Sequence, residues 1–584
     1  MMSDSSPVSA TPSASTPSHP AHPSPSKVVI IGLDGGTFDL IEPWVGEGLL
    51  PTFRRLMTQG AWGRLRSTMP PITAPAWSSF ATGKNPGKHG LIDFVFRHPD
   101  SYDVLPVNAS MRQGQSLWAL LSEMGSSVIV ANVPVTYPPE PVNGCLISGL
   151  LTPSEQSDFT YPPELADELR AEDYCIHSPQ SYAKGDMDCF LRAIYETTEL
   201  QLRVVRRLMR ERPWDFLMYV FRGTDRLQHG LWHFMDPAHP LHGAPGTDRY
   251  SNAILAYYQY IDRQLADLLS QLDSQTVLIL MSDHGAGPFH KYIHMNNWLL
   301  DWELLRLQRG PTTKLKHAMF ALGMTPLNAY NVLLNLGLGG LKGRVTKGKG
   351  QKKLARFFLS FKDIDWPQTR VYSLGNAGQL WVNLRGREPM GTVAPGSEYD
   401  EVCQEVVERL RAMEDPETGE RFVDQVYTRE MLFQGPCVER MPDIVFVPKG
   451  FRYLSFGEYE FASHRLMEVS YGITGWHRQD GMVLLYGAPV QAGVHLERAI
   501  IEDLAPTVLY LMGHPIPAGM DGCVLTDALL PEWIDQERLT PVEVLVGPST
   551  GAVREHEVSK RGRPYSPDDE EAVRQRLQDL GYLG

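Results

Sequence analysis

The chain has 584 residues, of which 42% are hydrophobic and 21% are charged, and its formal net charge is −14. This composition is that of an ordinary globular protein with more than one minimal domain. The negative charge argues against nucleic-acid binding driven by overall charge. No stretch is apolar and long enough to cross a bilayer. We therefore expect a cytoplasmic protein.

The six cysteines are scattered along the chain, and no two of them form a CxxC pair. Such usage is typical of thiols in a reducing compartment, because disulfide frameworks and cysteine-based zinc sites need paired spacings. The first 26 residues lack the apolar region of a secretory signal. Both observations favour the cytoplasmic location.

Changes in composition divide the chain into parts. Residues 1–26 are rich in Ser, Pro, Ala and His, and we expect a disordered tail because these residues cannot form a core. Segments 27–298 and 364–530 carry the patterns of the main domain. Residues 299–363 interrupt those patterns and are predicted to be a helical insertion with a basic loop. Residues 531–584 form a charged C-terminal extension.

Short apolar runs rich in β-branched residues are typical of strands buried on both faces of a parallel sheet. Such runs occur at 28–33, 128–131, 216–220, 277–281 and 482–486. Helical patterns lie between them, one opening at 117–121 and another covering 253–272, with apolar residues at three- and four-residue steps. The alternation predicts an α/β fold, a three-layer sandwich with a mostly parallel central sheet.

The predicted insertion contains helix-like segments at 302–307, 315–322 and 327–336. A basic, glycine-containing run follows them at 342–353. This run is either a solvated surface loop or a patch for an anionic substrate or an anionic membrane surface. Sheet structure is expected to resume near 369–384, and a short amphipathic helix is predicted at 570–580.

Asp225 and His229 are four residues apart, a spacing that places both side chains on one face of a helix. Such a pair can bind one zinc-sized ion, although an exposed salt link or a helix cap is the commoner reason for it. His233 continues the same spacing, either as a residue behind the site or as a chance match.

Other metal-ligand side chains follow predicted strands directly. Asp34 comes after the strand at 28–33, and Asp283 and His284 come after the strand at 277–281. Open α/β sheets collect their ligands outside the carboxyl ends of strands, and a buried, unpaired Asp would be costly. These positions therefore suit a metal site better than a core.

Thr73 lies two residues before Pro75, which suits the first turn of a helix. At a helix N-terminus the backbone N–H groups and the helix dipole favour an anion. The Thr73 hydroxyl is therefore either a helix cap, the commoner role, or a nucleophile that attacks phosphorus. The loop at 82–90 could approach a phosphate, but it lacks the P-loop spacing.

His477 lies before the predicted strand at 482–486 rather than after it, so the fold must bring it to the other candidates. With His477 included, the candidate ligands have spacings that fit two adjacent metal ions: Asp34, Thr73, Asp225, His229, Asp283, His284 and His477.

As a set, these motifs resemble the alkaline phosphatase superfamily, and most closely its type I phosphodiesterase and nucleotide pyrophosphatase branch and the phosphohydrolase/phosphomutase members. The segment TAPAWSSFATGKNPGKHG at 73–90 matches the nucleophile segment of that branch in length and in its T-x-P, T-G, P and H-G positions. The order of the candidate ligands matches as well. The resemblance covers about 27–297 and 364–525, and it implies an alkaline phosphatase-like catalytic domain over 27–298 and 364–530.

The resemblance implies two divalent metal ions, with zinc as the first choice and manganese or iron compatible with the same ligands. One ion would be held by Asp34, Thr73, Asp283 and His284, and the other by Asp225, His229 and His477. Metal coordination would activate Thr73 as the catalytic nucleophile, and a covalent phospho-threonine would form and then be hydrolysed. The Ala74 N–H would stabilise the phosphoryl oxygens.

The sequence departs from the family pattern at one position. Nucleotide pyrophosphatases commonly carry an asparagine three residues after the nucleophile, where this chain has Ala76. Lys84, Asn85 and His290 are the candidate substrate-binding replacements. Sulfatases of the superfamily need a Cys or Ser in a C/S-x-P-x-R context, which residues 73–77 lack, so sulfatase activity is disfavoured.

We expect a metal-dependent hydrolase that acts on a small-molecule phosphate mono- or diester. The alternatives are a phosphomutase or phosphotransferase of the same superfamily, and a non-catalytic binding protein that retains the site. Membrane contact through 342–353 is the less favoured reading of that run. The natural substrate and the oligomeric state stay open at this stage.

Overall fold

The computed structural model describes residues 27–582 apart from 99, 183–185, 326–327, 329–356, 456–460, 471 and 544–564. The expectations for the tail at 1–26 and the basic run at 342–353 lie outside the described residues, as does nearly all of the helix predicted at 327–336. Among the helices that are described, none is both long and apolar enough to cross a membrane.

A nine-stranded sheet forms the centre of the main domain, in the order β20-β2-β19-β9-β1-β8-β5-β6-β7. The strands from β9 to β6 in this order are parallel, whereas β19 runs antiparallel to both of its neighbours, and β7 runs antiparallel to β6. All five predicted strands lie in this sheet, so the predicted α/β fold is confirmed. The strands are β1 (Lys27–Leu33), β2 (Ala61–Arg66), β5 (Val128–Val133), β6 (Gly144–Ser148), β7 (Thr160–Tyr161), β8 (Phe216–Phe221), β9 (Thr276–Met281), β19 (Asp480–Tyr486) and β20 (Val494–Ile500).

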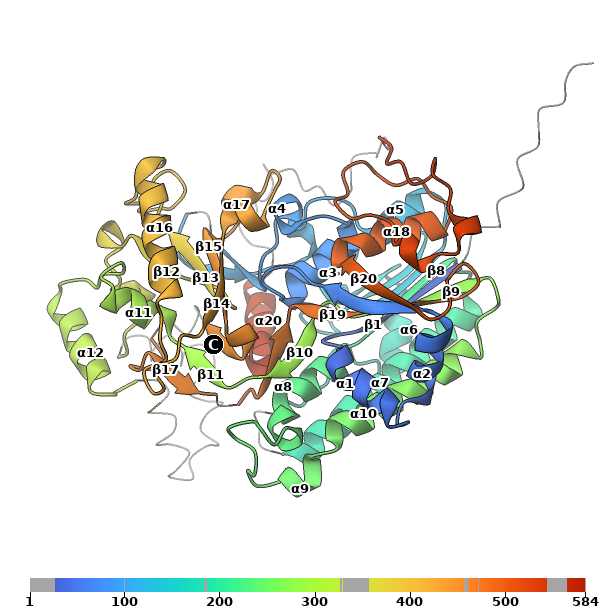
Figure 1. Ribbon diagram of the computed structural model, residues 1–584, viewed down its shortest axis with the longest axis horizontal. Coiled ribbons are helices and arrows are strands. Elements are labelled where there is room, and N and C mark those ends of the chain that lie inside the picture. The colour runs from blue at the N-terminus through green and yellow to red at the C-terminus, as the bar shows by residue number, and fades with distance from the viewer. Residues whose placement is uncertain are drawn as a thin grey trace, which may run out of the picture.

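Helices cover both faces of this sheet (Figure 1). One face carries α3 (Thr73–Thr82), α5 (Leu117–Glu123) and α18 (Leu504–Leu511). The other face carries α1 (Phe38–Gly46), α2 (Pro51–Gln59), α7 (Met187–Glu211), α8 (Gly223–Met235) and α10 (Ala253–Leu269). Shorter helices of this domain are α4 (Pro86–His89), α6 (Leu165–Ala171) and α9 (Thr247–Tyr250), and a hairpin is formed by β3 (Val95–Arg97) and β4 (Val104–Pro106).

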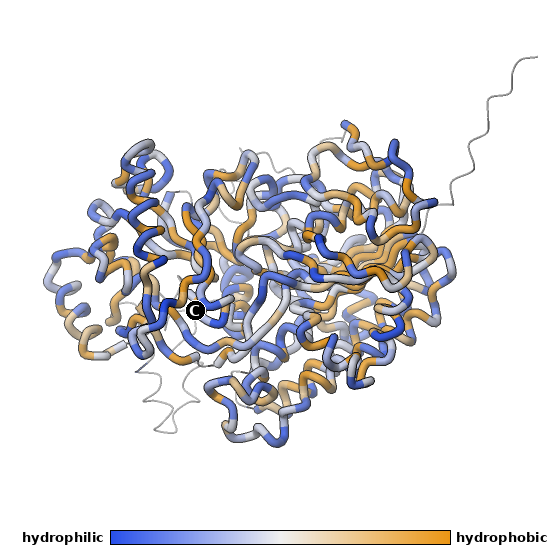
Figure 2. The backbone as a smooth tube through the Cα atoms, viewed as in Figure 1, coloured by the Kyte–Doolittle hydropathy of each residue, from blue (hydrophilic) through white to orange (hydrophobic). Residues whose placement is uncertain are grey.

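The strand β1 shows why the sheet is apolar on both sides. Successive side chains of a strand point to opposite faces, so Val28 and Ile30 join the core under α3 while Val29 and Ile31 join the core under α8 and α10. The tube coloured by hydropathy shows the same apolar interior along the central strands (Figure 2). Burial of both faces explains why the sequence of these strands is a continuous apolar run rather than an alternating one.

A second sheet has a core of its own, seen on the left of Figure 1. Its strand order is β12-β13-β15-β14, and α16 packs against it. The sheet predicted near 369–384 is therefore not part of the central sheet. The elements are β12 (Val371–Ser373), β13 (Gln379–Val382), α16 (Ser397–Arg411), β14 (Val423–Thr428), α17 (Arg429–Leu432) and β15 (Ile444–Pro448). A three-stranded sheet lies beside it, with β11 (Lys291–Ile293), β16 (Tyr453–Ser455) and β17 (Met467–Val469).

The described part of the predicted insertion contains α11 (Met295–Asp301), which begins before the expected boundary, and α12 (Pro311–Ala321), which covers most of the helix predicted at 315–322. The prediction of a helix at 302–307 is wrong. Trp302 caps the C-terminus of α11, and Glu303 adopts a left-handed conformation with φ of 60°, which a continuing helix cannot contain. The predicted C-terminal helix is present as α20 (Pro567–Leu580).

Gly32 in β1 allows α3 to lie close to the sheet. A Cβ atom at this position would come within 2.7 Å of the Trp77 ring and 2.9 Å of a Val220 methyl group. Trp77 is fully buried, so its ring has no free space into which it can move. The close approach fixes α3 against β1 and thereby sets the position of the first residue of the helix, Thr73.

The first prediction compares two glycine substitutions. We expect Gly32→Ala to lower the free energy of unfolding by about 1–3 kcal/mol, because the added methyl group overpacks a filled core. Gly46→Ala is the matched control, since no atom lies within 4 Å of a Cβ atom there. It should leave stability unchanged or raise it by about 0.4–1 kcal/mol. Urea unfolding curves measure both, and equal midpoints for the two variants would contradict this account of Gly32.

Candidate metal centre

The carboxyl ends of three adjacent parallel strands supply most of the centre. Asp34 follows β1, Asp283 and His284 follow β9, and Asp225 lies in the first turn of α8, which follows β8. The strand order β9-β1-β8 brings these ends together at one edge of the sheet. Backbone contacts fix the arrangement: the Asp34 N–H donates to the carbonyl of Phe221 over 2.9 Å.

Thr73 is the first residue of α3, and its side chain is completely buried. Its hydroxyl oxygen lies 3.2 Å from Nε2 of His284. The first N–H groups of an α-helix have no partners within the helix. The hydroxyl therefore lies beside both an imidazole and the positive end of a helix, a position that favours an anion.

His477 reaches the centre through a two-stranded ribbon. β18 (Gly475–Arg478) pairs antiparallel with β10 (Gly285–Pro288), and this pairing places His477 opposite Ala286. Because β10 begins directly after His284, the two imidazoles become neighbours. Their rings stack with centroids 3.6 Å apart. The pairing explains how His477 reaches the centre although it precedes β19, the next strand of the central sheet.

Three ligand atoms converge between α8 and β18. Oδ1 of Asp225 lies 3.1 Å from Nε2 of His229 and 3.5 Å from Nε2 of His477, and the two Nε2 atoms are 3.2 Å apart. Ligand atoms around a tetrahedral zinc ion, each about 2.0–2.1 Å from it, are separated by roughly 3.3 Å. The separations observed here are therefore compatible with one metal ion held by these three atoms.

The tautomers of these two histidines support the same conclusion. Nδ1 of His229 lies 2.7 Å from the carbonyl of Gly475, and Nδ1 of His477 lies 2.8 Å from the carbonyl of Pro71. A carbonyl accepts, so each Nδ1 carries a proton, and each ring turns its Nε2 towards the other. Wherever both Nε2 atoms are unprotonated, their lone pairs repel unless a cation lies between them. The hydrogen bonds to backbone carbonyls are the outer contacts that orient metal-bound histidines.

A second group is formed by Asp34, Asp283 and His284. Nε2 of His284 lies 3.2 Å from Oδ2 of Asp283 and 3.7 Å from Oδ1 of Asp34. Both of these carboxylate oxygens are buried and have no hydrogen-bond partner among the described residues. An orphaned buried carboxylate oxygen is costly, and two of them beside an imidazole are suitable donors for a divalent cation.

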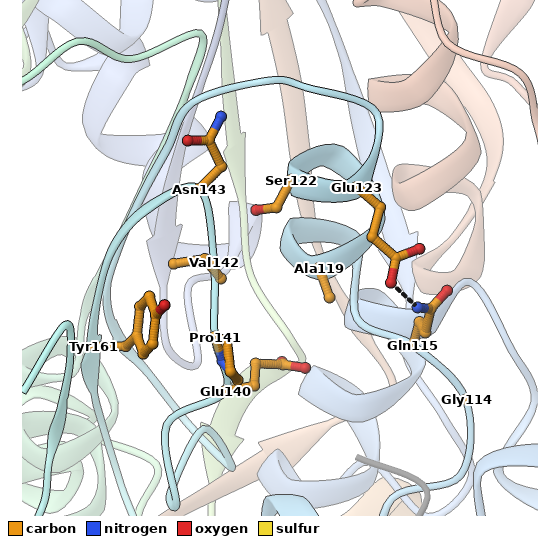
Figure 3. A pocket seen from close by; sticks show the side chains of 10 residues that line it. All are labelled: Gly114, Gln115, Ala119, Ser122, Glu123, Glu140, Pro141, Val142, Asn143 and Tyr161. Atoms are coloured by element: carbon orange, nitrogen blue, oxygen red, sulfur yellow. Dashed lines mark hydrogen bonds between the residues drawn. The ribbon is translucent and has the colours of Figure 1, made fainter. Parts of the chain in front are cut away.

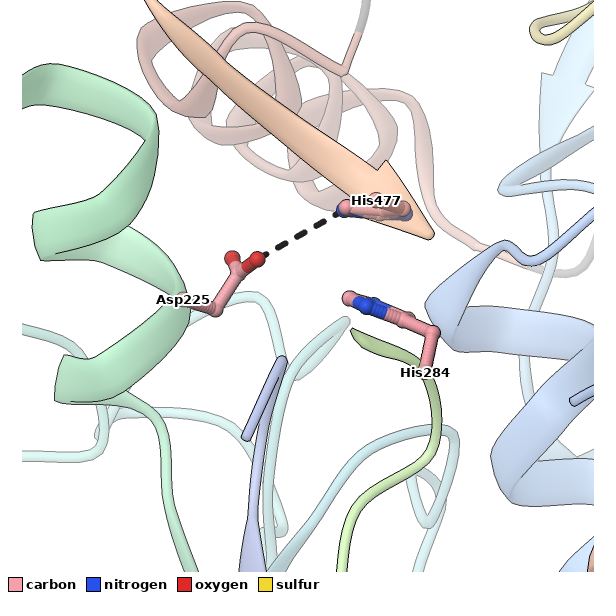
Figure 4. A group of neighbouring side chains, drawn as sticks. All are labelled: Asp225, His284 and His477. Atoms are coloured by element: carbon pink, nitrogen blue, oxygen red, sulfur yellow. Dashed lines mark ion pairs between the residues drawn. The ribbon is translucent and has the colours of Figure 1, made fainter. Parts of the chain in front are cut away.

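His284 of the second group also lies within reach of Asp225 and His477 of the first, so it joins the two groups. Asp34, Asp283 and His284 offer one set of atoms within 4.8 Å of one another, and Asp225, His284 and His477 offer another. Figure 4 shows the side chains of the second set pointing towards one another from α8, from the segment after β9 and from β18. The arrangement is consistent with a site for two metal ions.

The protonation equilibria reflect this crowding. Burial, followed by the charges of Asp283 and Asp225, raises the pKa of Asp34 well above its ordinary value, and burial raises the pKa of Asp283 to about 7. Burial also lowers the pKa of His284 to about 4 and that of His477 to about 3. Although burial raises the pKa of Asp225, the imidazoles of His229 and His477 lower it further, to well below its usual range. The imidazoles of His284 and His477 are therefore neutral at pH 7, which is the form that binds metals.

The sequence profile of the family described as type I phosphodiesterase / nucleotide pyrophosphatase matches residues 28–477. This match covers well over half of the chain. The chain belongs to this family. The expected membership in the alkaline phosphatase superfamily is thereby confirmed.

Two solved structures of one protein share this fold, and a third structure is less similar. Phosphonoacetate hydrolase from Sinorhizobium meliloti 1021, in complex with phosphonoformate, is 14% identical, with a TM-score of 0.51 over 84% of this chain and 96% of that chain. The complex of that protein with phosphonoacetate gives the same TM-score at 15% identity. Human ectonucleotide pyrophosphatase / phosphodiesterase 5 gives 0.44 at 13% identity, over 84% of this chain and 95% of that chain. A comparison with curated protein sequences found no match.

In this member of the family, the structure does not bring Lys84 and Asn85 to the centre. They follow the C-terminal end of α3, about 14 Å along the helix axis from Thr73. The Asn85 side chain instead caps α4, accepting from the Gly87 N–H over 2.9 Å, and donates to the carbonyl of Leu432 over 3.0 Å. The helix thus separates these two residues from Thr73, and their role in substrate binding stays a prediction.

His290 is also placed apart from both groups. Its ring lies edge-on to that of His239, with centroids 5.3 Å apart, and burial lowers its pKa to about 4. Its backbone N–H donates to the carbonyl of Arg452. Ala74, in contrast, follows Thr73 in the first turn of α3, where its N–H points from the helix N-terminus.

Two aromatic residues at the centre were not found from the sequence. Trp476 stacks on His477 with centroids 4.5 Å apart, and the Tyr582 hydroxyl donates to Oδ2 of Asp225. Tyr582 belongs to the extension at 531–584, which we expected to be a charged, turn-rich appendage. One feature of the sequence could have identified Tyr582. It is an aromatic residue directly after Gly581, at the end of the predicted amphipathic helix in a charged segment.

A cavity elsewhere in the protein is not part of this centre. It lies between α5 and the segment that leads into β6, and its lining includes Gln115, Glu140 and Tyr161 (Figure 3). Asn143 in its wall precedes β6, so the cavity is at the amino end of that parallel strand. The metal ligands lie at the opposite edge of the sheet.

The second prediction concerns metal binding and stability. Zn²⁺ added to chelator-treated protein should raise its melting temperature, since a ligand at 1,000 times its Kd stabilises the folded state by about 4 kcal/mol. Asp283→Asn should lose much of this gain without lowering the stability of the metal-free protein, because the substitution removes one of two crowded buried carboxylates. Differential scanning calorimetry with and without Zn²⁺ measures both. An equal loss of stability in the presence and absence of metal would show that Asp283 has a structural role alone.

Proposed function

We propose that this protein is a metal-dependent hydrolase of phosphate mono- or diesters and that Thr73 is its nucleophile. The observation that carries the proposal is the 3.2 Å contact between the Thr73 hydroxyl and His284, the residue that joins the two groups of potential ligands. A hydroxyl between two prospective cations is placed to attack phosphorus. Membership in the phosphodiesterase family supports the same class of reaction.

The chain's own residues define what happens at Thr73. The Thr73 hydroxyl gives its proton to solvent, its oxygen attacks phosphorus and forms a phospho-threonine, and the leaving oxygen takes up a proton from solvent. Water then cleaves the phospho-threonine, which releases phosphate or a phosphate monoester and restores the hydroxyl. When bound, two divalent ions supply the positive charge that lowers the pKa of the attacking hydroxyl and neutralises the phosphoryl oxygens. Complete burial of Thr73 keeps bulk water from the attacking oxygen.

The phosphoryl oxygens have few side-chain donors near Thr73. Ala76, which replaces the asparagine of nucleotide pyrophosphatases, packs into the apolar core under α3. Lys84 and Asn85 lie beyond the far end of the helix, and the His290 ring packs against His239, whereas the Ala74 N–H lies at the helix N-terminus beside Thr73. We infer that recognition of the phosphoryl group depends on the metal ions and this backbone group.

Zinc is the ion that we propose for both positions. Three imidazoles and three carboxylates provide the nitrogen and oxygen donors that zinc accepts, and the separations around His477 suit tetrahedral geometry. Manganese and iron accept the same donors.

Transfer of the phosphoryl group to an acceptor other than water is the second candidate. The complete burial of Thr73 favours it, because a site that excludes water protects a phosphorylated intermediate from hydrolysis. Acceptor-dependent product with little free phosphate would identify a mutase or transferase. A binding protein without catalysis is less well supported, since the nucleophile position is occupied by a hydroxyl in contact with His284.

The third prediction tests the nucleophile. Thr73→Ala should reduce turnover of p-nitrophenyl phosphate or bis-p-nitrophenyl phosphate by at least about 10³-fold, because removal of a nucleophile leaves the residual catalysis of the remaining site. Ser78→Ala is the matched control. It removes another hydroxyl of α3. That hydroxyl only donates to a backbone carbonyl within the helix, that of Ala74, over 2.8 Å. Comparison of the two substrates assigns the preference for mono- or diesters.

Mass spectrometry of acid-quenched wild-type protein should find the phosphoryl group on the peptide that contains Thr73. Turnover by Thr73→Ala at the wild-type rate would refute the assignment of the nucleophile. Loss of activity in Ser78→Ala equal to that in Thr73→Ala would assign the effect to disruption of α3.

The fourth prediction concerns the number of ions. Elemental analysis of purified wild-type protein should find about two divalent ions per chain, as in two-metal phosphoryl-transfer sites. His477→Ala should bind about one, because the loss of one imidazole opens the position between α8 and β18 while the ligands after β1 and β9 stay in place. A wild-type chain without bound ions after reconstitution would end the proposal.

A further inference from the structure

The C-terminal segment 565–582 is docked against the catalytic domain next to the metal centre, and α20 lies in the middle of the molecule (Figure 1). The Tyr565 hydroxyl lies 3.0 Å from the carbonyl of Val107 and 2.9 Å from that of Leu151. Further along, Arg574 donates to the carbonyl of Val104 over 2.7 Å. These anchors hold both ends of the segment, so its position is not that of a loose appendage.

The turn after α20 directs the chain inward. Gly581 has a φ of 81°, which favours glycine, and a Cβ atom there would come within 2.5 Å of Ile473 and 2.7 Å of the Tyr182 hydroxyl. The Tyr182 hydroxyl donates to the carbonyl of Leu580 over 3.0 Å. The carbonyl of Tyr582 accepts from the Asn376 side chain over 2.9 Å. The backbone on each side of Gly581 is thus fixed.

The side chain of Tyr582 enters the wall of the metal centre. It is 2% exposed, and its ring centroid lies 4.5 Å from that of Phe94, 5.5 Å from that of His229 and 5.9 Å from that of His477. Its hydroxyl donates to Oδ2 of Asp225. A residue near the end of the chain therefore contacts a candidate metal ligand directly.

The two oxygens of Asp225 have separate partners. Oδ1 faces the Nε2 atoms of His229 and His477, whereas Oδ2 accepts from Tyr582. Hydrogen bonds from outer residues orient metal-binding carboxylates and histidines, and their removal typically reduces metal affinity. The hydrogen bond at Oδ2 therefore favours Oδ1, which faces the two imidazoles, as the oxygen that Asp225 offers to an ion.

We propose that Tyr582 is a positioning residue that holds Asp225 as a one-oxygen ligand of the metal ion between α8 and β18. The inference rests on the proposed metal-dependent function and adds a contribution from the C-terminal segment. The ring by itself provides packing, and phenylalanine would provide the same packing. The hydroxyl is the group that acts on Asp225, so Tyr582→Phe separates the two contributions.

The experiment titrates chelator-treated protein with Zn²⁺ in competition with a fluorescent chelator. We expect wild-type protein to bind two ions, and Tyr582→Phe to bind one of them about 10–100-fold more weakly while the other affinity stays unchanged. Tyr565→Phe is the matched control, since its hydroxyl anchors the same segment to backbone carbonyls of Val107 and Leu151. It should bind both ions as the wild type does.

Each result has a distinct meaning. If wild-type protein binds two ions and Tyr582→Phe binds both equally tightly, the role of Tyr582 is refuted while the proposed function stands. Equal weakening by Tyr582→Phe and Tyr565→Phe would also refute it, because the effect would then come from docking of the segment. If wild-type protein binds no Zn²⁺, the proposed function itself fails.

The visible absorption of Co²⁺-loaded protein provides a second readout. A changed ligand at one ion should alter the absorption bands of that Co²⁺ ion in Tyr582→Phe, whereas the bands of Tyr565→Phe should match those of the wild type.

Discussion

Repulsion among buried ligand atoms is the constraint around which this structure is built. The Nε2 atoms of His229 and His477 face each other over 3.2 Å, and buried oxygens of Asp34 and Asp283 have no hydrogen-bond partner among the described residues. A folded protein retains such groups at a cost of several kcal/mol unless a cation neutralises them. The surrounding fold offsets this cost and holds the ligand atoms in these positions.

Three features of the fold hold them. The parallel strands β9, β1 and β8 end at one edge of the sheet and deliver the carboxylates and His284. The ribbon of β10 and β18 brings His477 back over His284. Close packing of Trp77 against Gly32 sets α3, and therefore Thr73, at a fixed depth. Each feature draws its stability from apolar burial away from the centre, which allows the centre itself to remain electrostatically unfavourable.

Sequence reasoning succeeded where one local rule was sufficient. The strands of the central sheet are apolar runs because both of their faces are buried, and Asp34 and Asp283 could be found because they follow such runs directly. The family resemblance placed Asp225 and His229 in the same site. Pairing between distant strands carries no local signal, so neither the β10–β18 ribbon nor the separate sheet containing β12 could be derived from the sequence.

The differences between prediction and structure have physical causes as well. The apolar pattern at 302–307 suggested a helix, but tertiary packing and the left-handed conformation of Glu303 end α11 before it. Lys84 and Asn85 are close to Thr73 in sequence, yet the helix between them converts nine residues into a separation along its axis. Tyr582 was overlooked because a charged C-terminal segment gives no indication of where its inward aromatic residues will dock.

The most direct test of the account is a crystal structure of the Zn²⁺-loaded protein with anomalous diffraction data collected at the zinc absorption edge. The account predicts two anomalous peaks about 3.5–4 Å apart. One should lie among Asp34, Thr73, Asp283 and His284, and the other among Asp225, His229 and His477. Zinc peaks found elsewhere, with the two imidazoles still facing each other and no ion between them, would contradict the central claim.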